Sequence, residues 1–330
     1  MDQPGIGRDR RIGSQQLFTL VWALLGVVAL AIIVTYSRVE PEQVYHFSQS
    51  GIAGGLGRAL VFSNFPVALI AIAMIGVSLL TLRTGSWLDL SGHRRGVQAV
   101  AIVAVFLCLV MAAPGVVDAG DLDPKPINVV PFVGVLLAVA LSGLALRHGR
   151  WPSRTALDWR GKLSVAVTIV FTIISLPWIV AELGFYIDKL PLIGRLFIAS
   201  EVPPGETHAA VHLGHHHGFD GLLFVISALT LGHVTRNRFE GGLATAVSGL
   251  LALMFTYGCF NLANDAWLEQ VVKRDWVEWE IPSVLTPSLS VAWGLILVGS
   301  VIVWYALFRS GEPAPEPAKT PARTLKLKAE

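Results

Sequence analysis

Five of the nine histidines of this 330-residue chain fall within ten consecutive positions. Side chains four residues apart share one face of a helix, and most of these histidines follow that interval. At roughly 100° per residue, four of them lie within about 100° of arc. Imidazoles that converge in this way are typical transition-metal ligands. The sequence therefore predicts a metal site formed by His208, His212, His215, His216 and, one turn after His216, Asp220.

Three further carboxylates are candidates for completing the metal shell or for acting as general base, namely Glu182, Glu206 and Asp265. Zinc is the expected ion because it suits imidazole with carboxylate, although copper and iron also bind imidazole. The same histidines would also suit a pH sensor based on imidazole titration, or a polar lid without metal. Gly214 and Gly218 weaken the helical premise, so the segment is alternatively a loop.

The rest of the chain is strongly apolar. It is 53% hydrophobic and 15% charged, whereas soluble domains are about 25% charged. A membrane-spanning helix needs roughly 20 mostly apolar residues, and isolated strands cannot satisfy their backbone in lipid. We therefore predict an all-α, polytopic integral membrane bundle of about eight transmembrane helices. The predicted spans are 17–36, 59–82, 97–115, 128–146, 163–184, 219–235, 242–263 and 287–308.

Lys and Arg are divided unevenly between alternate connecting segments. Of the 25 basic residues, 18 lie in the two termini and in the segments 83–96, 147–162 and 236–241. The other 7 lie in the segments 37–58, 116–127, 185–218 and 264–286. Because basic segments stay in the cytoplasm, both termini are predicted inside and the histidine segment outside. The predicted organisation is a cytoplasmic segment 1–16, a transmembrane domain 17–308 with the second set of segments as its outer loops, and a disordered cytoplasmic tail 309–330.

Polar and helix-breaking residues of the predicted spans gather in the outer third, among them Asn64, Asn128 and Asn261. A transport pathway would place polar groups near the midplane, so this distribution favours a pocket that opens outward. A pocket at the lipid–water boundary suits a lipid-like small molecule. Two outer stretches are expected to be ordered: 185–200 as an interfacial or re-entrant segment, and 266–281 as an amphipathic helix over the pocket.

The histidine string from His208 to His217 resembles a histidine box of membrane di-iron desaturases and hydroxylases, and eight spans with histidines are similar to haem A synthase. The former use several boxes on the cytoplasmic side, and the latter pairs histidines on different helices, so neither family identifies the chain.

The leading hypothesis is a metal-binding protein of a bacterial plasma membrane, with enzymatic action on a lipid-like substrate left open. The bacterial plasma membrane is expected from the Ala, Gly, Val and Arg bias and from the lack of an organelle-targeting segment. The alternative is a non-enzymatic metal-handling, pH-sensing or accessory subunit with other membrane subunits as partners. A net charge of +2 gives no indication of nucleic-acid binding.

Overall fold

The computed structural model describes residues 13–40, 47–84, 93–113, 115–117, 122–152, 158–182, 189–192, 194–196 and 217–309. Within these ranges every regular element is a helix, as predicted. The longer helices are α1 (Ser14–Tyr36), α2 (Gly51–Phe62), α3 (Ala68–Arg83), α4 (His93–Leu109), α5 (Val129–His148), α6 (Trp159–Ile174), α7 (Leu176–Glu182), α8 (His217–Thr235), α9 (Gly242–Gln270) and α10 (Val291–Val303).

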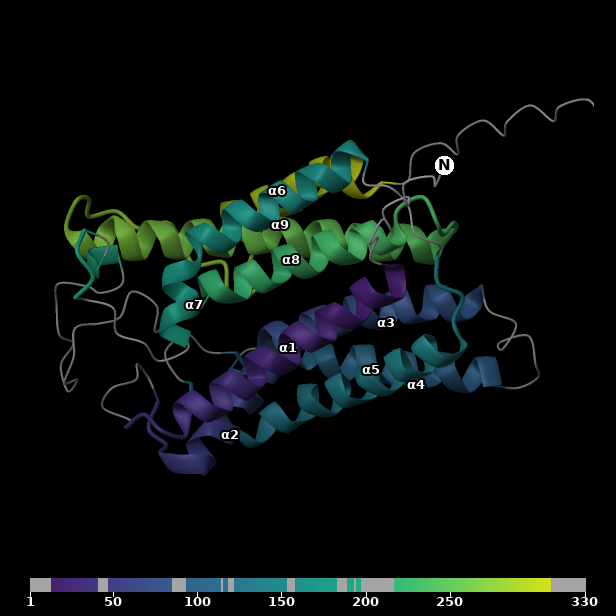
Figure 1. Ribbon diagram of the computed structural model, residues 1–330, viewed down its shortest axis with the longest axis horizontal. Helices are drawn as coiled ribbons and strands as arrows, with labels where there is room; N and C mark the ends of the chain where they lie inside the picture. Colours follow the sequence, from purple (N-terminus) through teal and green to yellow (C-terminus); the bar gives the residue numbers. More distant parts are fainter. Residues whose placement is uncertain are drawn as a thin grey trace, which may run out of the picture.

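Seven helical stretches of the described chain are long and apolar enough to cross a membrane, and they coincide with seven of the predicted spans. The other predicted span, 163–184, is divided into α6 and α7, neither of which is long enough to cross alone. Pro177 explains the break, because proline lacks an N–H and its ring clashes with the carbonyl oxygen four residues earlier, at Ile173. Figure 1 shows α7 turned away from the axis of α6. The chain is thus a helical membrane bundle.

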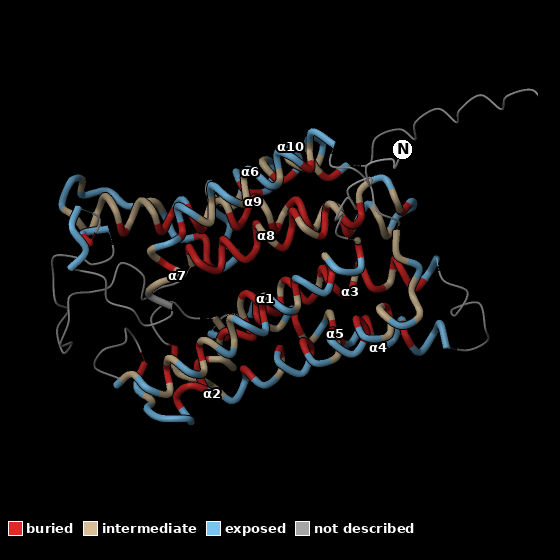
Figure 2. The backbone as a smooth tube through the Cα atoms, in the orientation of Figure 1, coloured by how far each residue is buried: buried red, intermediate tan, exposed pale blue. Residues whose placement is uncertain are grey.

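The two halves of the chain form two layers (Figure 1). Helices α1–α5 pack in one layer and α6–α10 in the other, and α1 and α3 contact the second layer through α8 and α9. Helix α8 lies in the core, since 15 of its 19 residues are buried, which Figure 2 shows as an almost continuous red helix. By contrast, α1, α4, α6 and α10 expose Leu, Ile and Val side chains, as expected for helices that contact lipid tails.

Arginines tie the helix termini together at one end of the bundle. Arg236, just after α8, donates to the carboxylate of Asp158 (2.5 Å) and to the carbonyl oxygen of Leu307 (3.4 Å). Arg238 donates to the hydroxyl of Ser14 at the start of α1. We call this end, where α1 begins and α3, α5 and α8 finish, the basic end. The end at which α8 begins is called the opposite end.

The long stretch formed by α2 and α3 is interrupted in the layer of α1–α5. Phe65, which precedes a cis bond to Pro66, leaves helical geometry. Asn64 Nδ2 donates to the carbonyl oxygens of Leu60 (2.7 Å) and Asn128 (2.9 Å), and Asn128 Nδ2 donates back to Asn64 Oδ1 (3.2 Å). The two asparagines therefore satisfy each other and nearby backbone groups, which ties this break to the start of α5.

Candidate functional site

The described part of helix α8 begins at His217, directly after the predicted metal-binding histidines, and its first described turn is held on two sides. The backbone N–H of Gly218 donates to the carboxylate of Asp265 in α9. A Cβ on Gly218 would lie 2.7 Å from the ring of Trp178 in α7, so this contact requires glycine. A carboxylate at a helix N-terminus also offsets the positive end of the helix dipole. The start of α8 is therefore fixed between α7 and α9.

One turn further along, α8 and α9 touch through a pair of glycines. A Cβ on Gly221 would lie 2.6 Å from the carbonyl oxygen of Gly258, and a Cβ on Gly258 would lie 2.6 Å from the carbonyl oxygen of Gly221. Small residues allow this close approach of membrane helices. Beside the contact lie Asp220, which is 8% exposed, and Asn261, which is 2% exposed. A carboxylate on α8 and an amide on α9 are thereby buried at the same end of the bundle.

Two of the buried N–H donors at this end that have no acceptor in the described part of the chain lie close to the start of α8. They are the indole Nε1 of Trp178 and the amide Nδ2 of Asn261. Buried donors are nearly always paired, and leaving one unpaired costs about 1–3 kcal/mol. Trp178 packs against Gly218 and Asn261 against Gly221, one turn apart on α8. Water or an oxygen-bearing ligand would satisfy each donor.

A buried arginine of α2 lies near the same turn. Arg58 is 5% exposed, its guanidinium is 5.5 Å from the ring centroid of Tyr36, and its charge interacts with His217. Ionisable residues buried in membrane spans usually mark functional sites. The prediction from sequence missed Arg58 because the predicted span began one residue later. The sequence did contain an indication of its burial, namely the glycines that precede Arg58, because small residues are typical of closely packed membrane helices. In the structure a Cβ on Gly55 would lie 2.4 Å from the carbonyl oxygen of Ile33 in α1, so these glycines belong to a helix packed in the bundle.

An aromatic layer separates this polar region from the middle of the bundle. The ring centroid of Tyr257 is 5.5 Å from that of Phe224 and 5.3 Å from that of Trp293. The Tyr257 hydroxyl donates to the carbonyl oxygen of Leu285 (2.7 Å), which ties α9 to the segment before α10. Because Asn261 follows Tyr257 by one turn toward the opposite end, the polar groups lie between this layer and that end.

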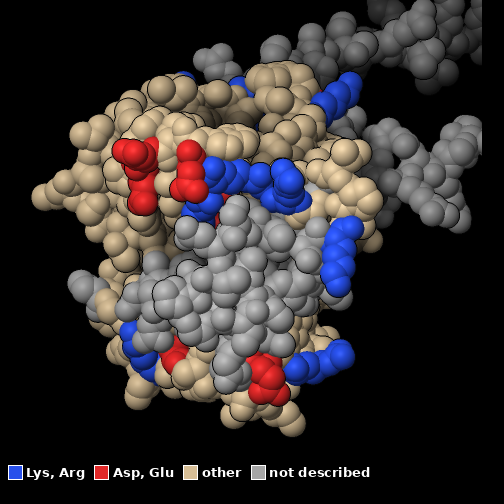
Figure 3. Space-filling view, turned by 90° about the vertical axis from the view of Figure 1, so that its left-hand side faces the viewer, with Lys and Arg blue, Asp and Glu red and all other residues tan. Residues whose placement is uncertain are grey.

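Helix α9 extends beyond its predicted end to Gln270. Past that point Lys273 pairs with Glu269 (2.7 Å), and Asp275, with a left-handed φ of 58°, ends the next helical turn. The prediction of a separate amphipathic helix over 266–281 is therefore wrong. The first part of its apolar and charged pattern belongs to the last turns of α9, and an irregular segment follows. Figure 3, which faces the opposite end, shows acidic and basic side chains on it.

The predicted site residues fall into two groups. Glu206, His208, His212, His215 and His216 lie outside the described residues. Glu182 is the last residue of α7, but its side chain is also outside what the structure describes. Asp220 and Asp265 are buried at the same end, on α8 and α9. Among the described residues, no three His, Cys, Asp or Glu side chains come together as metal ligands, so the metal site stays a prediction.

Comparison with known proteins gives no match: no protein family, no curated protein and no solved structure is significantly similar to the chain. The function therefore has to be inferred from the chemistry of the residues at the opposite end. That end combines a fixed helix start, buried carboxylates, a buried guanidinium and two buried donors.

Proposed function

We propose that this integral membrane protein binds a transition metal ion on the extracytoplasmic side, at the opposite end of the bundle. His208, His212, His215 and His216 would supply imidazoles and Asp220 a carboxylate. The observation that carries the proposal is the fixed start of α8: the histidine segment is continuous with a turn that packs against Trp178 and bonds to Asp265. Zinc fits imidazole with carboxylate best, and copper or iron are the other candidates.

The two described carboxylates receive different roles. Asp265 accepts the N–H of Gly218, so we assign it to positioning the first turn of α8. Asp220 lies in that turn itself, directly after the histidine segment, which makes it the better metal ligand. Glu182 and Glu206 then remain the candidates for a general base.

Action on a lipid-like substrate is the fuller form of the proposal. Trp178 and Asn261 offer N–H groups for a substrate oxygen, and Arg58 offers positive charge for an anionic group. A metal bound there would act as a Lewis acid. The alternatives make different predictions: a metal-handling or accessory subunit has a closed coordination shell, whereas a pH sensor responds to protonation and needs no metal.

Elemental analysis of protein purified without chelators tests the proposal. The wild type should carry stoichiometric transition metal, and His212→Ala and His216→Ala should lose it. Asp220→Asn removes a proposed ligand and should weaken metal affinity by at least the roughly 10–100-fold that losing a residue that supports a ligand costs. His233→Ala is the matched control, because His233 lies near the other end of α8. A metal-free wild type, or variants with wild-type metal content, would contradict the proposal.

Sidedness is tested by labelling with a membrane-impermeant thiol reagent. In a chain without Cys108 and Cys259, Gly214→Cys should react in intact cells. Glu240→Cys, an exposed position at the basic end, should react only after the membrane is permeabilised. The reverse pattern would place the histidines in the cytoplasm and remove the extracytoplasmic site.

A further inference from the structure

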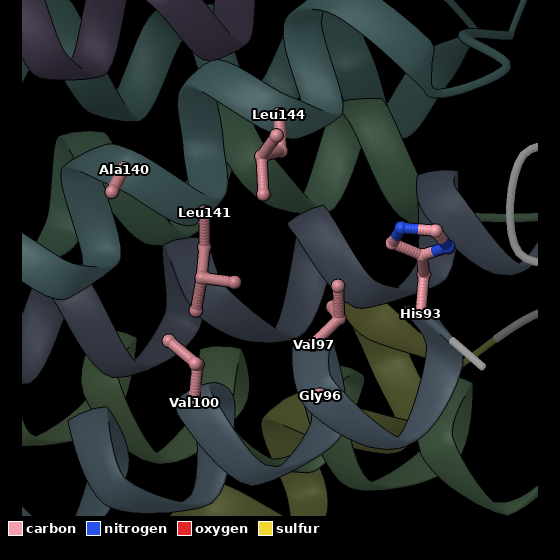
Figure 4. A pocket seen from close by; sticks show the side chains of 7 residues that line it. All are labelled: His93, Gly96, Val97, Val100, Ala140, Leu141 and Leu144. Atoms are coloured by element: carbon pink, nitrogen blue, oxygen red, sulfur yellow. The ribbon is translucent and has the colours of Figure 1, made fainter.

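A groove runs between α4 and α5 near the basic end, far from the site described above. It has a volume of about 530 Å³ and is lined mainly by apolar side chains. Figure 4 shows Val100 of α4 and Leu141 of α5 pointing toward one another across it, with His93 at one end. A Cβ added to Gly96, which also lines the groove, would meet no atom within 4 Å. The groove therefore has open space at the start of α4.

A second cavity of about 220 Å³ lies between α3, α4 and α9. Its lining includes the guanidinium-bearing side chains of Arg83 and Arg94 together with apolar Leu79 and Leu243. Val97 lines both cavities, so they lie next to each other at the first turns of α4. An apolar groove thus adjoins a smaller cavity with two positive charges.

The two arginines have no counter-charge within the described chain. Neither Arg83 nor Arg94 forms an ion pair with a described carboxylate, and both residues are exposed. Arginine matches the geometry of phosphate oxygens, with which it forms paired hydrogen bonds. Basic pockets between membrane helices bind the head groups of anionic lipids. The charge of this cavity is therefore complementary to a phosphate.

We propose that the two cavities form one binding site for an anionic phospholipid of the leaflet at the basic end. Arg83 and Arg94 hold its phosphate, and the groove between α4 and α5 takes one acyl chain. The spacing along the helix suits one molecule, because Arg94 and Val100 are six residues apart on α4, a rise of about 9 Å along its axis. A lipid merely in contact with the surface would need only apolar area, whereas this site selects for negative charge.

The test uses the purified full-length chain in a neutral detergent at low ionic strength. Thermal unfolding is followed during titration with phosphatidylglycerol or, in parallel, phosphatidylcholine of the same chain length. Phosphatidylglycerol should stabilise the wild type at much lower concentration. In the double variant Arg83→Gln/Arg94→Gln its apparent affinity should fall about 30-fold, since each basic side chain near the lipid surface contributes about a factor of five. The charge-matched control Arg95→Gln/Arg150→Gln changes two exposed arginines that line neither cavity and should keep wild-type affinity.

A second pair of variants tests the acyl groove. Gly96→Trp should fill the groove and weaken binding of phosphatidylglycerol, while Gly143→Trp, on α5 outside the lining and also without neighbours within 4 Å, should not. Inorganic phosphate alone should give no comparable stabilisation. Equal responses to the two lipids, equal losses in both arginine pairs, or full replacement of the lipid by inorganic phosphate would overturn the proposal.

Discussion

Replacing Gly221 by alanine should push α8 away from α9 and destabilise the protein. The new Cβ would lie 2.6 Å from the carbonyl oxygen of Gly258 and 3.1 Å from the backbone nitrogen of Leu262, and neither atom can rotate away. The first distance is 0.8 Å short of the 3.4 Å of ordinary contact. If α8 moves outward by this distance to relieve the overlap, the neighbouring contacts with α9 open by a similar amount, and each loses about a quarter to a half of its dispersion energy. Overpacking of this kind costs about 1–3 kcal/mol.

The expected effect on thermal stability follows from the length of the chain. For a large single domain, 1 kcal/mol corresponds to about 2–4 °C in Tm, so Gly221→Ala should lower Tm by about 2–12 °C. Cys108 and Cys259 are unpaired and at least partly buried, so a dye that fluoresces on reaction with thiols reports unfolding in detergent. Metal content measured on the same samples shows whether the site depends on this helix contact.

Gly249→Ala, on the same hairpin, is the matched control. A Cβ at Gly249 would meet no atom within 4 Å, and alanine is favoured over glycine in a helix by about 1 kcal/mol. Its Tm should therefore stay the same or rise. Gly258→Ala should lower Tm as Gly221→Ala does, and the double variant should lose less than the two losses added together, because both changes separate the same pair of helices. If Gly221→Ala were as stable as Gly249→Ala, the backbone contact between α8 and α9 would be refuted.

Two further changes test how the ends of the bundle are held. Partial burial alone would raise the pKa of Asp158, but a backbone N–H of α6 and the guanidinium of Arg236 lower it below its ordinary value. The Asp158 side chain is 45% exposed, so the pair contributes less than about 1 kcal/mol. This stability is present above about pH 4 and lost as the pH falls; thermal scans should show this loss in the wild type and not in Asp158→Asn. Tyr257→Phe leaves the buried carbonyl of Leu285 without its donor and should cost about 1–3 kcal/mol in chemical unfolding, whereas Tyr305→Phe, at an exposed site, should cost nothing measurable.

The helices could be predicted from the sequence because their signals are local. A run of about 20 apolar residues is visible without knowledge of its neighbours, and seven of the predicted spans are long helices in the structure. The break between α6 and α7 depended on how far Pro177 would bend the chain, which the local pattern leaves open. The end of α9 was missed because an amphipathic period is the same in a surface helix and in the continuation of a buried one.

The site was predictable only in part, because its members meet through contacts between distant segments. Asp220 and Asp265 were chosen for their type and position near the outer span ends, and both are buried at the opposite end. The bond from Gly218 to Asp265 joins residues 47 positions apart, and no pattern within either helix indicates it. Arg58 was missed for the same reason: it is buried because α2 packs against α1, and a prediction of spans from apolar runs does not show which helices pack together.

The length of α9 keeps its charged end away from the hydrocarbon of the membrane. At 1.5 Å per residue its 29 residues measure about 43 Å, against about 30 Å of hydrocarbon. When the helix stands upright, the surplus of roughly 13 Å lies beyond the acyl chains, and Glu269 and Lys273 pair at this end. Because charged side chains are costly in hydrocarbon, the surplus lets α9 tilt or meet a thicker bilayer before this pair would enter the acyl chains.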